Sequence, residues 1–185
     1  MYFDSTGPDR TGETVKIAVR EAKERQISHI VTASNTGATV FSLAQEAHKQ
    51  GYEGKLVCVT HVYGFKENGK NELADEDREK LIKQGIQVHT SAHVLSGAER
   101  GLSRKFQGVY PVEMIAHTLR MFGQGSKVCV EVAVMALDAG LVPQGKPIIA
   151  LGGTGRGADT AIILTPGYNS AILETKIHEI LCKPR

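Results

Sequence analysis

The sequence has no tryptophan, and aromatic residues make up only 5% of its 185 positions. A ring that stacks on a planar ligand must therefore come from Tyr2, Phe3, Tyr63, Phe65, Phe106 or Tyr110. Cysteine is also scarce: Cys58, Cys129 and Cys182 lie far apart in apolar surroundings and form no CxxC pair. This spacing excludes a disulfide scaffold and a cysteine zinc cluster, and it fits a reducing, cytoplasmic setting.

Charge of one sign and long apolar runs are likewise missing. Lys and Arg number 22 against 20 Asp and Glu, with no basic stripe, so nucleic acid is not an expected partner. The longest apolar run, 128–137, is interrupted by Glu131 and falls short of the roughly 20 residues that span a bilayer. The first ten residues contain Asp4, Pro8 and Asp9 and no apolar core, so we expect neither a signal peptide nor a membrane partner.

What the sequence does contain is an alternation of short β-branched runs with segments of helical period, which is typical of βαβ units. We therefore expect one α/β domain over 1–185, with helices on both faces of a sheet. Segment 127–139 is ambiguous, since its valines alternate as in a strand while Met135 to Gly140 reads as a helix end, and we favour one buried helix. The predicted strands are 29–34, 55–60, 86–89, 147–151 and 161–164, and the predicted helices are 11–26, 36–50, 75–84, 96–106, 112–122, 127–139 and 172–181.

Two loops that follow predicted strands have the composition of ligand-binding loops. The first contains Ser34, Asn35, Thr36, Gly37, Ala38 and Thr39 and runs directly into a helix. The start of a helix has unpaired backbone N–H groups that attract phosphate, and Gly37 permits close approach of a ligand. The alternative is that Ser34 or Asn35 only caps the helix.

The second loop contains Gly152, Gly153, Thr154, Gly155, Arg156 and Gly157. It resembles a dinucleotide fingerprint, but a strand-like run follows it where the fingerprint requires a helix, so we reject that interpretation. Segment 140–147 is not a phosphate-binding P-loop either, because Pro147 occupies the Ser/Thr position. A mobile glycine-rich loop with Arg156 could contact a phosphate or carboxylate, while the alternative is a wide hairpin with Arg156 in solvent.

Three histidines and one phenylalanine complete the candidates. His61 directly follows the second predicted strand and could touch a ligand or transfer a proton, and Phe65 is the best candidate for stacking on a flavin. Either could instead be an ordinary surface or core residue. His89 and His93 are four residues apart but sit at a strand end without an HExxH pattern, so we expect no metal site.

Three stretches resemble the C-terminal α/β domain of pyruvate kinase and the small stand-alone proteins similar to it. The turn 34–39 resembles the turn that holds a phosphate of fructose 1,6-bisphosphate there, and Gly108 to Val112 resembles a Gly-Val/Ile-x-Pro-Val turn of that domain. Segments 142–151 and 155–164 are similar to its closing strand, glycine loop and final strand. Segment 91–106 has no clear counterpart.

The resemblance implies a three-layer α/β/α fold with a five-stranded mixed sheet of order 3-2-1-4-5, strand five being antiparallel. The two loops would then face each other across the crevice at the switch point of the sheet. In the stand-alone proteins this site is associated with FMN, so we expect an FMN cofactor and no pyruvate kinase activity. The alternative is a non-enzymatic sensor of a phosphorylated metabolite such as a sugar phosphate. Whether the protein is an enzyme or a homo-oligomer stays open.

Overall fold

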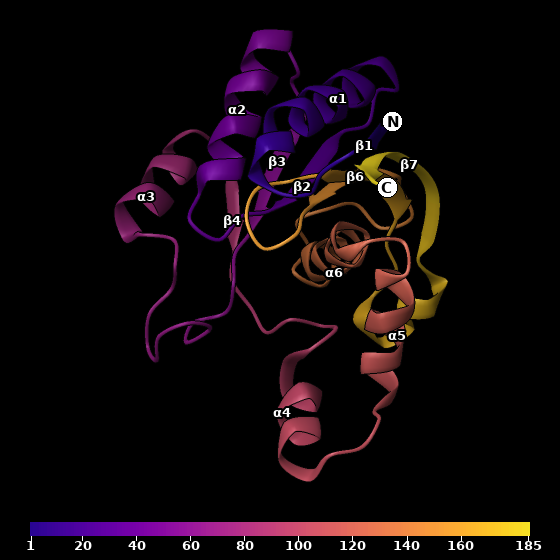
Figure 1. The fold of residues 1–185 in the computed structure, drawn as a ribbon. Helices are drawn as coiled ribbons and strands as arrows, with labels where there is room; N and C mark the ends of the chain where they lie inside the picture. Colours follow the sequence, from indigo (N-terminus) through magenta and orange to yellow (C-terminus); the bar gives the residue numbers. More distant parts are fainter.

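A mixed β-sheet forms the centre of the molecule in the computed structural model, which describes residues 1–185. Its order is β1-β7-β6-β5-β2-β3-β4 (Figure 1). β2 is parallel to β3 and β5, β3 is parallel to β4, and β6 is antiparallel to β5 and β7. The strands are β1 Tyr2–Phe3, β2 His29–Ala33, β3 Lys55–Val59, β4 Gln87–His89, β5 Ile148–Gly152, β6 Thr160–Thr165 and β7 Lys176–Pro184.

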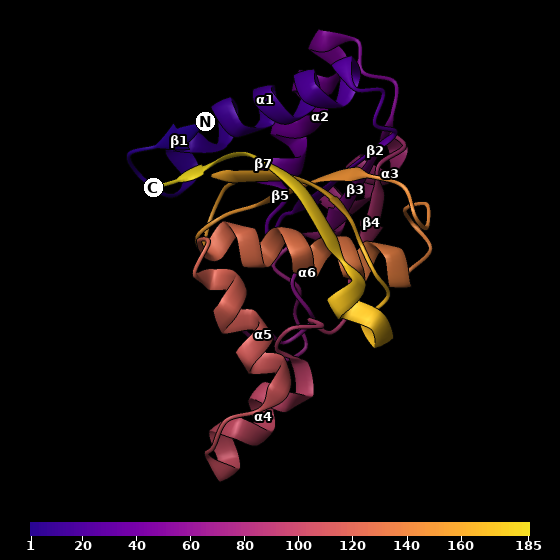
Figure 2. The same cartoon turned by 90° about the vertical axis from the view of Figure 1, so that its right-hand side faces the viewer.

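Helices cover both faces of this sheet, and Figure 2 shows α1 and α2 on one side and α6 on the other. Each central strand is therefore apolar at successive positions: Ile30 packs in the core under α1, and Val31 packs in the core under α6. The helices are α1 Thr11–Glu24, α2 Ala38–Gln50, α3 Asp75–Lys83, α4 Gly97–Phe106, α5 Pro111–Arg120 and α6 Gln124–Asp138, with short 3-10 turns at Pro8–Arg10 and Asn169–Glu174.

The sheet is wider than expected, and the prediction of five strands is wrong. β7 pairs with β6, and the two-residue β1 pairs with β7, so two strands extend the sheet beyond β6. Counted from the opposite edge, β4, β3, β2, β5 and β6 lie next to one another in that order. The addition brings the two chain ends together at the β1 edge, as Figure 1 shows.

The closing helix predicted over 172–181 is also wrong, because most of that segment is β7. Its apolar residues recur at intervals compatible with a helix, but Ile180 and Glu179 lie opposite Ile162 and Ile163 of β6. The edge of β6 would expose unpaired backbone groups, and pairing with β7 satisfies them. Tertiary pairing thus overrides the local pattern.

The segment 127–139 is helical, as favoured from the sequence, and its burial explains the ambiguity. α6 contacts the sheet with one face and α5 and the C-terminal segment with others, so nearly every position from Cys129 to Leu137 is buried. α4 and α5 extend away from the body beneath α6 (Figure 2). No helix in the structure has both the length and the apolar character needed to cross a membrane.

Strand order reverses between β2 and β5, and this arrangement places the two candidate loops together. From β2 the chain continues outward to β3 and β4, whereas β5 lies on the other side of β2. Because β2 and β5 are parallel, their carboxyl ends lie at the same edge of the sheet. Ligands of open α/β sheets bind at such a switch point.

Candidate functional site

The loop after β2 leaves a row of backbone donors free at the start of α2. Gly37 occupies the N-cap position with a φ of 91°, and it makes no side-chain cap. The backbone N–H groups of residues 36–39 donate no hydrogen bond within the protein. Ser34 accepts a bond of 3.4 Å at Oγ from the N–H of Val40, so one buried hydroxyl holds the loop against the helix.

The glycine-rich loop after β5 is tied to its surroundings at both ends. Asn35 Nδ2 donates to the carbonyl of Gly155 at 3.3 Å, which links the two candidate loops directly. The N–H of Ala158 donates to Thr11 Oγ1 at 3.0 Å, and the N–H of Gly7 donates to Asp159 Oδ2 at 3.1 Å. The N-terminal segment therefore supports the loop from behind.

The two loops line one cleft of about 1030 Å³. Of the residues predicted to hold the ligand, namely those of the two loops with His61 and Phe65, all line this cleft except Gly37 and Gly152, and His89 and His93 do not line it. Gly37 is buried behind the loop, and Gly152 is the last residue of β5 and packs against the start of α6. Arg156 lines the cleft with an exposed side chain.

His61 and Phe65 stand on the β3 side of the cleft. Their ring centroids are 3.9 Å apart, and His93 lies 5.4 Å from His61. His61 Nδ1 is 2.6 Å from Glu72 Oε2, and Lys66 Nζ is 2.5 Å from Glu72 Oε1. Burial opposes ionisation of the Glu72 carboxyl, but hydrogen bonds from Lys66 and His61 outweigh it and hold the pKa of Glu72 below its usual value.

Sequence reasoning missed seven further residues that line the cleft: Pro8, Thr11, Ala33, Lys66, Glu72, Gln124 and Val128. Lys66 and Glu72 belong to an irregular loop without periodicity, so no sequence signal marked them. Thr11 is the first residue of α1, whose N-cap is Arg10, and its hydroxyl accepts a hydrogen bond from the glycine-rich loop. Gln124 and Val128 lie on the first turns of α6, whose position depends on the fold.

The cysteines lie away from this chemistry. All three are buried and unpaired, and burial raises the pKa of Cys58 to about 12 and that of Cys182 to about 11. A thiol with a raised pKa is a weak nucleophile at neutral pH. No group of three His, Cys, Asp or Glu side chains converges in a way that could hold a metal ion. What the cleft offers is binding by backbone N–H groups, cationic side chains and rings.

Comparison with known proteins places the chain in a family. The family model described as "Pyruvate kinase, alpha/beta domain" matches residues 13–164. Among solved structures, the chain is similar to a pyruvate kinase from Cryptosporidium parvum, with 13% identity, a TM-score of 0.41 and coverage of 83% of this chain and 22% of that one. A pyruvate kinase of the same organism in complex with ADP gives 14% identity, a TM-score of 0.40 and coverage of 91% and 23%. This chain thus spans less than a quarter of the length of those kinases. Since the family match extends from α1 through most of β6, the protein belongs to the family of the pyruvate kinase α/β domain.

Proposed function

We propose that the cleft binds FMN, or a similar phosphorylated small molecule, with the phosphate at the start of α2. The observation that carries this proposal is the row of unpaired N–H groups at 36–39, in a loop that lines the cleft. Together with the partial positive charge of the helix start, such donors form a ready site for an anion. Every helix start leaves such donors, and what favours a ligand at this one is that its loop lines the cleft together with Arg156.

Cationic side chains on two sides of the cleft support the same assignment. Arg156 comes from the glycine-rich loop and forms no ion pair in the structure, so its guanidinium is free to contact a phosphate. Lys66 comes from the loop after β3 and is paired with Glu72. The free arginine therefore supplies the uncompensated charge.

The rest of the cleft suits a ligand with a planar ring. Ligand pockets commonly measure about 300–1,000 Å³, and this one is at the upper end of that range at about 1030 Å³. His61 and Phe65 line it with rings on which a flavin could stack. A sugar phosphate would use the donors of α2 but not these rings. Pyruvate kinase activity is not part of the proposal, since the chain covers only 22–23% of the kinases it resembles.

A fluorescence titration with FMN and riboflavin tests the proposal. We expect FMN to bind and to be quenched, and riboflavin to bind at least about tenfold more weakly because it lacks the phosphate that meets the helix start. Equal affinity for the two flavins would contradict the phosphate assignment. If neither flavin binds but fructose 1,6-bisphosphate does, the protein is better described as a sensor of a sugar phosphate than as a flavoprotein.

A further inference from the structure

A second, smaller cavity lies between the cleft and the projecting helices. It is lined by α6, by the loop before α4, by Arg100 of α4 and by Arg120 at the end of α5. It shares the residues Ala33, Asn35, His61, Phe65, Gln124 and Val128 with the larger cleft, so the two spaces are neighbours. Neither the phosphate loop at Thr36 to Thr39 nor the glycine-rich loop lines it.

A buried ion pair forms one wall of this cavity. Lys127 and Glu131, one turn apart on α6, are in contact, and their side chains are only 6% and 7% exposed. Glu131 also accepts a hydrogen bond of 3.0 Å at Oε1 from the N–H of Leu95, so each carboxylate oxygen has a partner within the protein. The pair has no net charge, so it contributes no net electrostatic attraction to a charged ligand.

Two arginines then give the cavity an excess of positive charge. Glu131 is the only carboxylate in the lining, and Lys127 neutralises it. Arg100 forms no ion pair, and Arg120 donates from Nε to the neutral amide oxygen of Gln124 at 2.8 Å. All three cations line this cavity. Burial lowers the pKa of Lys127 against the opposing effect of Glu131, and the nearby charges of Arg120 and Arg100 act in the same direction as burial.

The size of the cavity limits the ligand. It measures about 130 Å³. A protein cavity of about 150 Å³ accommodates benzene, so this one has room for about six non-hydrogen atoms and none for a fused-ring cofactor.

We propose that this cavity binds a small organic acid of about two to three carbons, whose carboxylate is held by Arg100 and Arg120 next to the ligand in the larger cleft. A guanidinium presents parallel N–H donors that match the two oxygens of a carboxylate, and two uncompensated guanidinium groups match a dicarboxylate best. The ligand would be a second molecule beside the occupant of the cleft. The inference does not depend on what the cleft binds.

The test is a calorimetric titration of malonate into the full chain without flavin, at constant ionic strength. We expect measurable binding to the wild type, and affinity lower by about tenfold or more in Arg100→Gln and in Arg120→Gln. Arg104→Gln is the matched control: Arg104 lies on the same helix as Arg100, is exposed and does not line the cavity, so its affinity should be unchanged. Far-UV circular dichroism checks that each variant is folded.

Three results would overturn the proposal. The first is that malonate does not bind to the folded wild type. The second is that Arg104→Gln weakens malonate binding as much as Arg100→Gln and Arg120→Gln do. The third is that inorganic sulfate binds as tightly as malonate. A parallel FMN titration of Arg120→Gln separates this proposal from the previous one. If Arg120→Gln loses malonate binding but still binds FMN, the result supports two separate sites. If the wild type binds malonate but no flavin, the result supports the proposed acid site and refutes only the flavin assignment.

Discussion

Gly157 illustrates how one residue serves both packing and the site. Its φ is 71°, and a Cβ added there would lie 2.4 Å from Thr11 Oγ1 and 2.6 Å from Pro8 Cα. Only glycine fits that approach, because the N-terminal segment has to come close enough for Thr11 to bond the loop at Ala158. The glycine content of this loop thus has a packing cause in addition to any need to approach a ligand.

Arg156 is the residue on which the charge of the proposed phosphate site depends most. Arg156→Ala removes a charge-assisted contact of roughly 1.5–3 kcal/mol, so we expect FMN to bind about tenfold or more weakly. Because the side chain is exposed, the free energy of unfolding should change by no more than about 0.5 kcal/mol. Fluorescence titration and urea unfolding measure the two quantities.

Lys146→Ala provides the matched control for this substitution. Lys146 is exposed just before β5, at the opposite end of that strand from the glycine-rich loop. Its removal takes away the same unit of charge without touching the cleft. Equal weakening of FMN binding in both variants would show a general charge effect and contradict the direct contact of Arg156.

At the scale of one residue, the sequence marks some site positions and hides others. Ser34 and Thr39 are visible because polar residues follow an apolar strand and precede a helix, a pattern set by local chemistry. Lys66 and Glu72 are invisible because the ion pair that brings them to the cleft forms within an irregular loop. The role of Thr11 is also invisible, because its partner Ala158 is 147 positions away.

Among the elements, β7 is the one whose type the sequence misrepresents, and its packing provides a test. Leu181 is 7% exposed in the core beneath α1, whereas Leu173 in the preceding turn is 82% exposed. Leu181→Ala should lower the free energy of unfolding by about 2–5 kcal/mol through lost burial and the cavity it leaves. Leu173→Ala should change it by no more than about 0.5 kcal/mol. Urea unfolding of both variants gives the comparison.

An amphipathic helix over 172–181 would predict a different result. On a helix, Leu173 and Leu181 are eight positions apart and lie close to the same face, so both substitutions would cost a similar amount. Similar losses in the two variants would therefore contradict the strand. The two patterns are hard to separate by eye because Ile177 and Ile180 also fit a helix, and only the register with β6 decides.

α6 shows the opposite case, in which an ambiguous pattern was assigned to the right element. Val128, Val130, Val132 and Val134 alternate as in a strand, but burial of the helix on several sides allows apolar residues at most positions around it. The charged pair Lys127 and Glu131 within that helix could not be placed from the sequence. Their spacing of four residues is common on exposed helix faces, whereas here both side chains are buried and Glu131 accepts a hydrogen bond from the N–H of Leu95.

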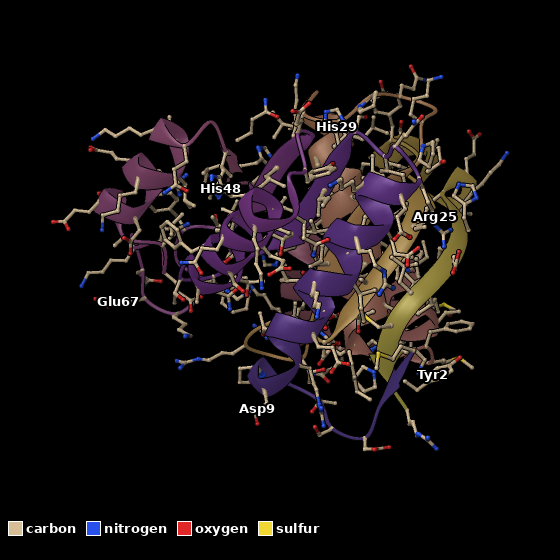
Figure 3. All side chains as sticks on the ribbon, turned by 90° about the horizontal axis from the view of Figure 1, so that it is seen from above. Tyr2, Asp9, Arg25, His29, His48 and Glu67 are labelled. Carbon is tan, nitrogen blue, oxygen red and sulfur yellow. The ribbon has the colours of Figure 1, made fainter.

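On the scale of the whole molecule, folding lowers the pKa of three histidines that lie in different parts of the fold. Figure 3, viewed from above, shows the position of His29. His29 begins β2, His89 ends β4, and His93 lies in the wall of the small cavity. Burial lowers the pKa of each from its ordinary value of 6.5, and for His93 the opposing effect of Glu131 is smaller.

These shifts determine the direction in which stability changes with pH. In the unfolded chain the three histidines take up protons near pH 6.5, whereas in the folded protein they resist protonation until a lower pH. Between these values the unfolded state binds more protons, so the free energy of unfolding falls as the pH falls. From about one pH unit above 6.5, both states are neutral at these positions, and the contribution is constant. The carboxylates with lowered pKa, Glu21 and Glu72, act only in a more acidic window, below their ordinary value of 4.5.

We therefore expect the free energy of unfolding, measured with urea from about pH 8 to about pH 5, to be flat at first and then to decline, with at most about 1.4 kcal/mol per pH unit from each histidine. His89→Gln should make the decline less steep, because the unfolded chain then takes up one proton fewer. His48→Gln is the control, since His48 is exposed on α2 and the decline should not change. Stability that rises as the pH falls through 6.5 would mean that protonated histidines are favoured in the folded state, the reverse of what burial imposes. If His48→Gln made the decline less steep by as much as His89→Gln does, the pH dependence would come from exposed histidines and not from buried ones.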